Sequence, residues 1–240
     1  MRAYGLTDIG KSRPTNEDSF YLPQKSERFC AIADGMGGHN AGEVASSMAI
    51  DVFCKEMRAA ERMGSSALHH AVERANKKVY ERSCSAEKLS GMGTTFTALV
   101  ADGRRIHIAH VGDSRAYLIR SGGISRVTQD HTLVEEMVSK GVISEREARV
   151  HPKRNLLTRA LGTSETVEVD LIQLDIRGDE VLLLCSDGLS NYVSEHDMLH
   201  VVTGAGEWSE KLKTLVQIAL NAGGSDNITA LIVTFEGDRR

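Results

Sequence analysis

The chain has 240 residues, of which 41% are hydrophobic and 26% are charged; this is the composition of a soluble globular protein and leaves room for one large domain or two small ones. The formal net charge of −4 gives no electrostatic reason to expect nucleic acid or an anionic membrane as a partner. No apolar run approaches the roughly 20 residues that span a bilayer, and the N-terminus lacks the apolar core of a signal peptide, so we expect a cytoplasmic protein.

The four cysteines indicate neither a metal or disulfide framework nor a cysteine-dependent phosphatase. The four cysteines are widely spread and form no C-x-x-C motif, which argues against structural zinc and a disulfide framework. A cysteine phosphatase needs an arginine six residues after the cysteine, and the residues in that position here are Met36, Ala60, Ser90 and Asn191. The sequence therefore excludes that class.

The first motif in chain order is "GLTDIGKS", residues 5–12, which matches the phosphate-binding loop of nucleotide hydrolases. Such a loop must open directly into a helix, but the next residues, "RPTNED", are turn formers and weak helix formers. The strand-like "LLLCSD" at 182–187 gives weak support, because those enzymes need alternating strands and helices and the middle of this chain is strand after strand. A nucleotide hydrolase is therefore a minor alternative.

Two amphipathic helices are predicted next, over residues 41–58 and 66–82, each with an apolar stripe at helical spacing. They precede β-rich runs between residues 94 and 128 that are divided at 102–103, 112–114 and 121–123. Each break is short enough for a hairpin, so these runs predict an antiparallel sheet.

Residues 131–160 change character, with helix-like pieces at 133–139 and 144–149 followed by the polar "HPKRN", and we interpret them as an inserted flap. The remaining predicted elements are strands at 167–174 and 181–185, a helix at 207–221 and a last strand at 228–235. Together the elements predict one α+β domain with helices packed on largely antiparallel sheets.

Four aspartates share a local pattern in which an apolar strand meets a tight polar turn. They are Asp34, Asp113, Asp187 and Asp226. One such aspartate is usually only a turn former, but four carboxylates at strand ends would repel one another unless a cation lay between them. Carboxylate and carbonyl oxygens without cysteine suit Mg²⁺ or Mn²⁺, and two such ions are a known arrangement for displacement at phosphorus. Arg13 could offer its guanidinium to a phosphate, and Glu17 and Asp18 add acidic groups to the same site.

The motifs occur in a recognisable order: "SRPTNEDS" (12–19), "ADGMGGHNAGEVAS" (33–46), "GMGTT" (91–95), "VGDSRAY" (111–117), "DHTLVEEMV" (130–138), "LTRALG" (157–162), "CSDGLSN" (185–191) and "GSDNITALIV" (224–233). In this order the chain closely resembles the bacterial, single-domain form of the metal-dependent protein phosphatases, the PPM or type 2C serine/threonine phosphatases. The resemblance spans essentially all of residues 1–240. It implies a single catalytic domain built as an α-β-β-α sandwich of two antiparallel sheets flanked by helices, with residues 131–160 as a flap subdomain.

The resemblance also implies roles for individual residues. Asp34 would bridge two metal ions and the Gly35 carbonyl would be a ligand; Asp187 and Asp226 would be terminal ligands, and Glu17 and Asp18 would hold metal-bound waters. Asp113, together with Asp187, would hold a third and weaker ion, and Arg13 would bind the phosphate.

The identity of the proton donor stays open at this point. Animal members of the family read D-G-H-G-G, whereas this chain has Met36 in place of the histidine. His39 is one candidate, because an imidazole with a pKa near 6.5 suits proton donation around neutral pH. A metal-bound water is the other candidate, and packing or exposure is the favoured interpretation of the remaining histidines.

The expected function is hydrolysis of phosphoserine and phosphothreonine on proteins by a Mg²⁺- or Mn²⁺-dependent enzyme, through direct attack of a metal-bridging water at phosphorus. The expected partners are phosphorylated proteins, among them a bacterial serine/threonine kinase and its substrates, and we expect a monomer. The alternative from another class is a phosphoprotein-binding domain that has lost turnover; the filled acidic positions argue against it.

Overall fold

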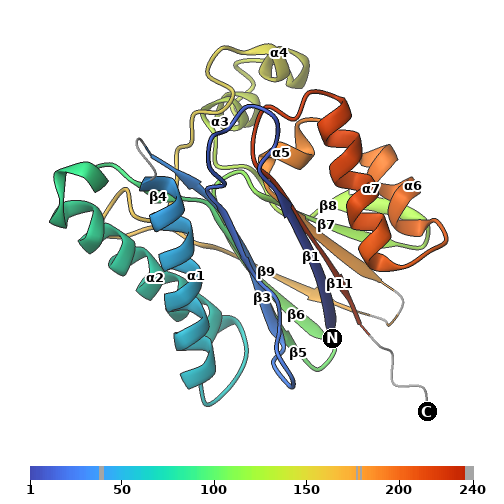
Figure 1. Ribbon diagram of the computed structural model, residues 1–240. Helices are drawn as coiled ribbons and strands as arrows, with labels where there is room; N and C mark the ends of the chain where they lie inside the picture. Colours follow the sequence, from blue (N-terminus) through green and yellow to red (C-terminus); the bar gives the residue numbers. More distant parts are fainter. Residues whose placement is uncertain (38–40, 177, 179, 236–240) are drawn as a thin grey trace.

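A computed structural model describes residues 1–37, 41–176, 178 and 180–235. Two antiparallel sheets lie face to face, with helices on both outer faces (Figure 1). The first sheet, called the β1 sheet, has the order β1 (Arg2–Asp8), β11 (Ile228–Thr234), β10 (Val181–Cys185), β7 (Arg115–Arg120) and β8 (Gly123–Arg126). The second, called the β3 sheet, has the order β2 (Asp18–Tyr21), β3 (Phe29–Met36), β5 (Phe96–Asp102), β6 (Arg105–Val111) and β9 (Asp170–Asp175), and the short β4 (Gly93–Thr94) also pairs with β3. The expected α-β-β-α sandwich is confirmed.

The alternation of side chains along the strands builds three apolar layers. In β3, Phe29, Ala31 and Ala33 pack under the helices, whereas Cys30 and Ile32 point between the sheets. Strand β11, between β1 and β10, divides its residues in the same way between the helices and the other sheet. Because a strand buried on both faces needs apolar residues at nearly every position, these runs are almost continuously hydrophobic.

The helices cover the outer faces. Helices α1 (Ala41–Ala59) and α2 (Ser65–Ser85) pack on the β3 sheet, close to the predicted bounds. Helices α6 (Glu195–Thr203) and α7 (Trp208–Asn221) pack on the β1 sheet, with the short α5 (Asp187–Ser190) beside them. Helix α6 has no counterpart among the predicted elements. In the part of the chain that the structure describes, no helix has the length and apolar character to cross a membrane.

One predicted hairpin is wrong. Strands β5 and β6 pair, as do β7 and β8, but the break at 112–114 joins β6 of one sheet to β7 of the other. Gly112 makes this crossing with a φ of 107°, and a Cβ there would lie 2.7 Å from the Cβ of Thr95. The turn is therefore a sheet-to-sheet crossing that only glycine fits, although its length suits a hairpin.

A 3₁₀ turn, η1 (Glu87–Leu89), follows α2.

Residues 131–160 contain the two predicted helical pieces, which are α3 (Leu133–Ser139) and α4 (Glu145–Val150). Thr132 forms an isolated bridge with Leu157, so the two ends of the segment are joined at its base. The segment lies at one end of the sandwich, next to the loop between β1 and β2 (Figure 1). Strand β9 begins at Asp170, three residues later than predicted.

Candidate functional site

The site begins with two carboxylates on neighbouring strands. Asp18 at the start of β2 and Asp34 in β3 are directly opposite each other in the antiparallel register. Directly opposed residues place their side chains on the same face with Cβ atoms about 5 Å apart, where like charges repel. The fold therefore creates an unfavourable charge pair at one end of the β2–β3 ladder.

The backbone of Asp34 is fixed by two threonines, Thr94 and Thr95. Thr95 Oγ1 accepts a hydrogen bond from Asp34 N at 2.9 Å, and the Thr94 hydroxyl and the Thr95 N–H both donate to Asp34 O at 2.9 Å. Ser114 supports Thr95 through a hydroxyl contact of 2.7 Å. Asp34 thus lies inside β3 and is held rigidly there, whereas the sequence pattern places it in a turn.

Asp18 is buried with only half of its carboxylate satisfied. Its Oδ2 accepts hydrogen bonds from Thr229 Oγ1 at 2.6 Å and Ser186 Oγ at 2.9 Å, while its buried Oδ1 has no hydrogen-bond partner. Burial raises the pKa of Asp18 to about 7, against the lowering effect of those two hydrogen bonds.

Asp187 and Asp226 approach from the β1 sheet. Asp187 is the first residue of α5, directly after β10, and Asp226 precedes β11. Burial and then repulsion from Asp226 raise the pKa of Asp187 to about 6, and a hydrogen bond with the Asp34 carboxyl moderates the rise. Burial, followed by the charges of Asp18, Asp187 and Asp113, raises the pKa of Asp34 well above its usual value.

Asp113 follows β6 at the sheet-to-sheet crossing. Burial raises the pKa of its carboxyl well above the ordinary value, and the charge of Asp187 adds to the rise. The structure therefore brings all four strand-end aspartates, together with Asp18, to one end of the sandwich.

Arg13 lies on the loop between β1 and β2 and reaches the same end. Its Nη2 donates to Asp226 Oδ2 at 2.8 Å, and its side chain is 48% exposed. That hydrogen bond, with the charges of Asp226, Glu17 and Asp34, raises the pKa of Arg13. The guanidinium is thus drawn to the carboxylates and open to solvent.

The loop itself settles the alternative of a nucleotide-binding loop. Residues 5–8 are the second half of β1, the chain then turns at Gly10, and no helix begins at Lys11. Asn227 fixes the loop by donating to Ile9 O at 2.9 Å and Thr15 O at 3.0 Å and by accepting from Glu17 N at 2.8 Å. A phosphate-binding loop of that class needs the helix that is missing here.

Glu17 and Gly35 are in close contact with the start of α1. Gly35 N donates to Glu17 O at 3.0 Å, and a Cβ on Gly35 would lie 2.1 Å from Gly42 O. Burial raises the pKa of the Glu17 carboxyl, and a hydrogen bond from the Gly42 backbone opposes the rise. Only glycine allows β3, the Glu17 backbone and α1 to approach this closely.

The predicted proton donor His39 lies outside the described residues. Of the other histidines, His110 donates from Nε2 to Gln129 O at 3.0 Å and contacts the Thr97 hydroxyl through Nδ1 at 2.9 Å. Burial lowers its pKa to about 4, so it is a neutral core residue at physiological pH. His131 accepts from Gly112 N through Nδ1 at 3.1 Å and lies 3.1 Å from Asp170 through Nε2.

The sequence profile of protein phosphatase 2C matches residues 4–228. The chain belongs to this family. The serine/threonine phosphatase stp of Listeria monocytogenes is 39% identical over 241 residues, covering 97% of this chain and 95% of that protein. A crystal structure of the Mycobacterium tuberculosis serine/threonine phosphatase PstP superposes with a TM-score of 0.90 at 39% identity, covering 98% of this chain and 99% of that chain. A structure of the PstP catalytic domain in complex with two manganese ions has a TM-score of 0.87 at 37% identity and covers 98% of both chains.

The carboxylate end of this phosphatase 2C fold suits a divalent cation. Its donors are oxygen atoms, Asp18 Oδ1 is buried without a partner, and the Asp34 and Asp187 carboxyls share a hydrogen bond. Hard oxygen donors of this kind favour Mg²⁺ or Mn²⁺. Within the described residues no three acidic, histidine or cysteine side chains have the spacing of a complete metal cage.

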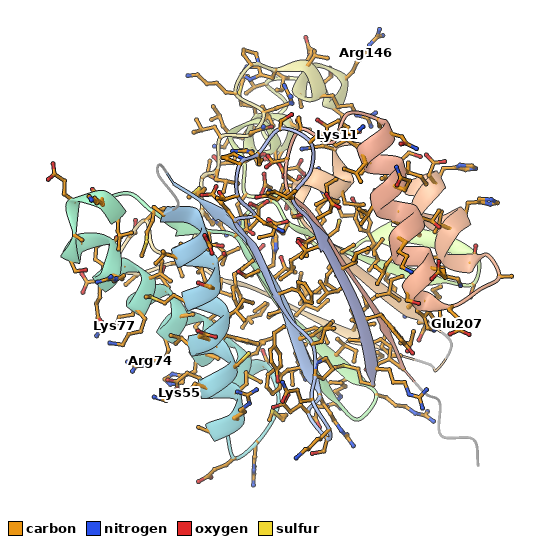
Figure 2. The ribbon with its side chains drawn as sticks, in the orientation of Figure 1. Lys11, Lys55, Arg74, Lys77, Arg146 and Glu207 are labelled. Atoms are coloured by element: carbon orange, nitrogen blue, oxygen red, sulfur yellow. The ribbon has the colours of Figure 1, made fainter. Side chains whose placement is uncertain are left out.

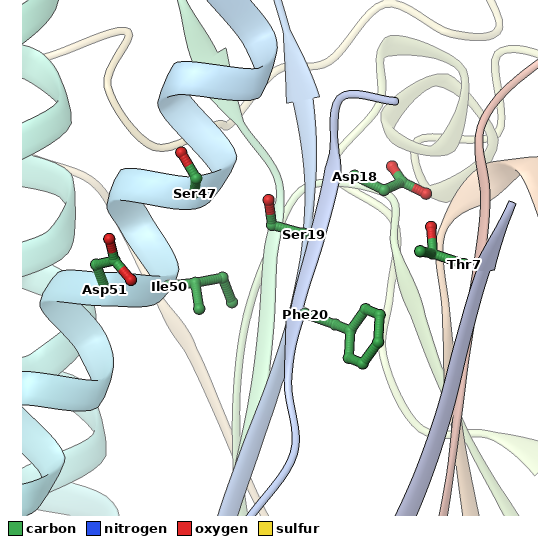
Figure 3. Close-up of a pocket in the computed structure, with 7 residues that line it drawn as sticks. All are labelled: Thr7, Asp18, Ser19, Phe20, Ser47, Ile50 and Asp51. Atoms are coloured by element: carbon green, nitrogen blue, oxygen red, sulfur yellow. The ribbon is translucent and has the colours of Figure 1, made fainter. Parts of the chain in front are cut away.

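A separate shallow pocket of about 310 Å³ opens along the edge strand β2. Figure 3 shows Ser47, Ile50 and Asp51 of α1 on one side of β2 and Asp18 and Thr7 on the other. Of the carboxylate cluster only Asp18 reaches it. Arg13 does not line this pocket.

Several residues that hold the site lie within the quoted motifs but have no predicted role of their own. Thr94 and Thr95 orient Asp34, Ser186 and Thr229 bind Asp18, and Asn227 fixes the arginine loop. A polar residue inside an otherwise apolar strand, such as Thr229 in "ITALIVT", is the one local signal that could have indicated them.

Proposed function

We propose that this chain is a metal-dependent phosphatase that hydrolyses phosphoserine and phosphothreonine on proteins. The observation that carries the proposal is a group of four aspartates whose pKa values are raised by burial and mutual repulsion, beside the exposed ion pair of Arg13 and Asp226. The four are Asp18, Asp34, Asp113 and Asp187. A site that accumulates uncompensated negative charge next to an anion-binding guanidinium suits cations and a phosphate together. The serine/threonine phosphatases named among its relatives support the same assignment.

We assign Asp34, Asp187 and Asp226, with the Gly35 carbonyl, to two core Mg²⁺ or Mn²⁺ ions. Asp113 and Asp187 would hold a third, and Glu17 and Asp18 would orient water around the core ions. When bound, the ions would neutralise charge on the phosphoryl oxygens and lower the pKa of water. Oδ1 of Asp18 is buried and accepts no hydrogen bond from the protein. It can therefore accept one from a water, which supports the water-orienting role.

Arg13 has the role of binding the substrate phosphate. Its partner in the structure is the carboxylate of Asp226, 2.8 Å away. A substrate phosphate can take the place of this carboxylate, so the guanidinium keeps an anionic partner throughout. Its planar fork and permanent charge suit the non-bridging oxygens of the phosphoryl group, on which negative charge accumulates during transfer.

Direct attack of water on phosphorus is the mechanism that these residues favour. Burial raises the pKa of Cys54 and Cys185 to about 12, so neither is a thiolate nucleophile at neutral pH. As the phosphorus bond to water forms, the bond to the serine or threonine oxygen breaks, and that oxygen takes up a proton. We retain His39 or a water as the proton donor.

The decisive experiment measures phosphate release from a phosphothreonine peptide with Mn²⁺, with excess EDTA, and with the variant Asp34→Ala. Release that requires Mn²⁺ and disappears in the variant supports the proposal. A folded protein without release under any metal would identify a phosphoprotein-binding domain instead. Single-turnover reaction in ¹⁸O water should place one labelled oxygen in phosphate with no phosphorylated protein formed, whereas a phosphorylated protein trapped by rapid quenching would contradict direct attack.

The wider assignments rest on the family. We propose that residues 1–240 act as one catalytic domain with 131–160 as its flap subdomain, as a monomer in the cytoplasm. Its partners would be phosphorylated proteins, among them a serine/threonine kinase and the substrates of that kinase. Size-exclusion chromatography with light scattering tests the monomer.

A further inference from the structure

The segment between α3 and the end of the 131–160 region carries an unusual concentration of positive charge. Residues 145–159 contain five Lys or Arg residues and two acidic residues, Glu145 and Glu147, although the whole chain has a net charge of −4. Glu147 is occupied, because its carboxylate accepts from Ser144 N at 2.8 Å and Ser144 Oγ at 2.7 Å in a capping box at the start of α4. Negative charge within the segment therefore does little to neutralise the cations.

Four of these cations are exposed and unpaired. Arg159 forms ion pairs with Glu168 and Asp170, at 3.1 and 3.0 Å. No ion pair to a described residue involves the other four, which we call the basic strip: Arg146, Arg149, Lys153 and Arg154. Cations held on a folded surface without partners attract an anionic ligand at little structural cost.

Exposed apolar side chains accompany the basic strip. Val150 is 79% exposed and Leu156 is 51% exposed, and they are among the most exposed large hydrophobic residues of the described chain. Ile9, on the loop that carries Arg13, is 41% exposed. Apolar side chains surrounded by polar ones are typical of surfaces that bind another polypeptide.

The basic strip is tied to the candidate phosphatase site through its base. Leu133 N donates to Leu156 O at 2.9 Å, Thr158 N donates to His131 O at 2.8 Å, and His131 N donates to Gly112 O at 2.8 Å, one residue before Asp113. Figure 2 shows Arg146 and Lys11 at the same end of the molecule, and Lys55, Arg74 and Lys77 away from it on α1 and α2. A polypeptide whose phosphate lies at Arg13 can therefore extend toward the strip.

We propose that the basic strip binds acidic residues that flank the phosphorylated residue of a protein substrate. The inference rests on the proposed phosphatase function and adds a substrate class to it: phosphoserine or phosphothreonine within a segment rich in carboxylates or carrying a second phosphate. Arg149 and Arg154 contact the acidic flank, and Val150 and Leu156 contact apolar side chains between the acidic residues.

The test compares three phosphothreonine peptides that differ only in flanking Asp and Glu, the matched Asn and Gln, or a second phosphorylated residue, at several salt concentrations with Mn²⁺. We expect kcat/KM for the acidic and doubly phosphorylated peptides to exceed that for the neutral peptide by about tenfold at low salt, mainly through KM, and the advantage to shrink as salt rises. Arg149→Gln/Arg154→Gln should remove the advantage and leave the neutral peptide and p-nitrophenyl phosphate unchanged.

Two further variants keep the result interpretable. Lys55→Gln/Lys77→Gln removes the same amount of positive charge from α1 and α2 and should retain the preference for acidic peptides. Arg146→Gln/Lys153→Gln serves as a second strip variant if Arg149→Gln/Arg154→Gln misfolds. Equal rates for all peptides with the wild type, or equal losses in the strip and α1/α2 variants, would overturn the inference.

A second readout separates this inference from the function on which it rests. Fluorescence anisotropy of the labelled acidic and neutral phosphopeptides on an Asp34→Asn background measures binding without turnover. A binding preference in Asp34→Asn, together with a wild-type protein that hydrolyses none of the peptides, would contradict the phosphatase function and support the strip. Hydrolysis without any binding preference would do the reverse.

Discussion

Asp18 and Asp130 are both only 8% exposed, yet their surroundings differ completely. Asp130 is bound in a fork by Arg115, with contacts of 3.0 and 2.6 Å, and Arg126 approaches to 3.6 Å. Asp18 has two hydroxyl donors, no cation within reach of an ion pair among the described residues, and one oxygen without any partner.

The difference separates two uses of a buried carboxylate. Asp130 is neutralised by the protein itself, so its charge helps to define the fold around β7 and the base of the 131–160 segment. Asp18 and its neighbours leave their charge uncompensated, and the fold tolerates this only because protons or added cations can offset it. A buried acid without a cation is thus a better indicator of a functional site than burial alone.

The largest expected effect comes from Asp34, at the centre of the uncompensated group. Asp34→Ala should lower kcat/KM for a phosphothreonine peptide by more than about 1,000-fold, because a ligand shared by the core ions would be lost. The fold should survive, since the variant relieves repulsion. Steady-state hydrolysis with Mn²⁺ measures the loss of kcat/KM, and calorimetric Mn²⁺ titration measures the loss of metal binding. Wild-type Mn²⁺ affinity in the variant would contradict the assigned role.

The next largest effect is a difference in the free energy of unfolding between variants of Asp130 and Asp18. Asp130→Asn removes the partner of Arg115 and should destabilise the protein by roughly 2–4 kcal/mol. Asp18→Asn, measured in chelator, should cost less than about 1 kcal/mol or stabilise, because it removes an uncompensated charge. Urea unfolding of both variants decides the matter; a larger loss for Asp18→Asn would break the comparison.

Arg13 should show an intermediate effect. Arg13→Ala should reduce kcat/KM by about 10- to 100-fold through weaker phosphate binding, with a smaller loss for Arg13→Lys, which keeps the charge but not the fork. Lys11→Ala, two residues away on the same loop, is the matched control and should change kcat/KM by less than about twofold. Loss of activity in Lys11→Ala with ATP or GTP turnover in the wild type would restore the nucleotide-hydrolase alternative.

The smallest effect is a pH dependence of stability without metal. The folded-state pKa of Asp18, about 7, lies above that of an unfolded aspartate, so the stabilising proton is present at low pH and lost as pH rises toward 7. Asp187, with a pKa of about 6, acts in the same direction, whereas the lowered pKa of His110 acts in the opposite one.

The difference in unfolding free energy between wild type and Asp18→Asn isolates the contribution of Asp18 from that of His110. In chelator the wild type should lose about 1–2 kcal/mol relative to the variant between pH 4.5 and 8. Mn²⁺ added at pH 8 should reverse the loss. A difference that stays constant with pH would show that Asp18 is already ionised in the folded protein.

Most of the fold could be predicted from periodicity. Residues 41–58 and 66–82 have clear helical stripes, and 181–185 and 228–235 have clear apolar runs, so burial alone indicates their structure. The crossing at Gly112 could not be predicted in this way, because turn length does not reveal which sheet receives the next strand. It is decided by the close approach of Gly112 to Thr95, a contact between residues far apart in the sequence.

In the candidate site too, local sequence patterns identify some residues, whereas the roles of others depend on long-range contacts. Four aspartates beside apolar strands could be identified locally, and the structure brings them together, although Asp34 lies within its strand rather than after it. The residues that orient them, such as Thr95 and Asn227, lie within the quoted motifs, but they act through long-range hydrogen bonds that a local pattern does not reveal. The role of His39 remains a prediction.

The order of strands in the β1 sheet has a consequence for synthesis. Strand β11 lies between β1, made first, and β10, and it follows Asp226 directly. Residues 228–234 must therefore leave the ribosome before the gap in this sheet can be closed, and until then β1 has no neighbour in the sheet. The nascent protein can assemble the α1 and α2 half early, but it acquires phosphatase activity only after its translation has passed residue 234.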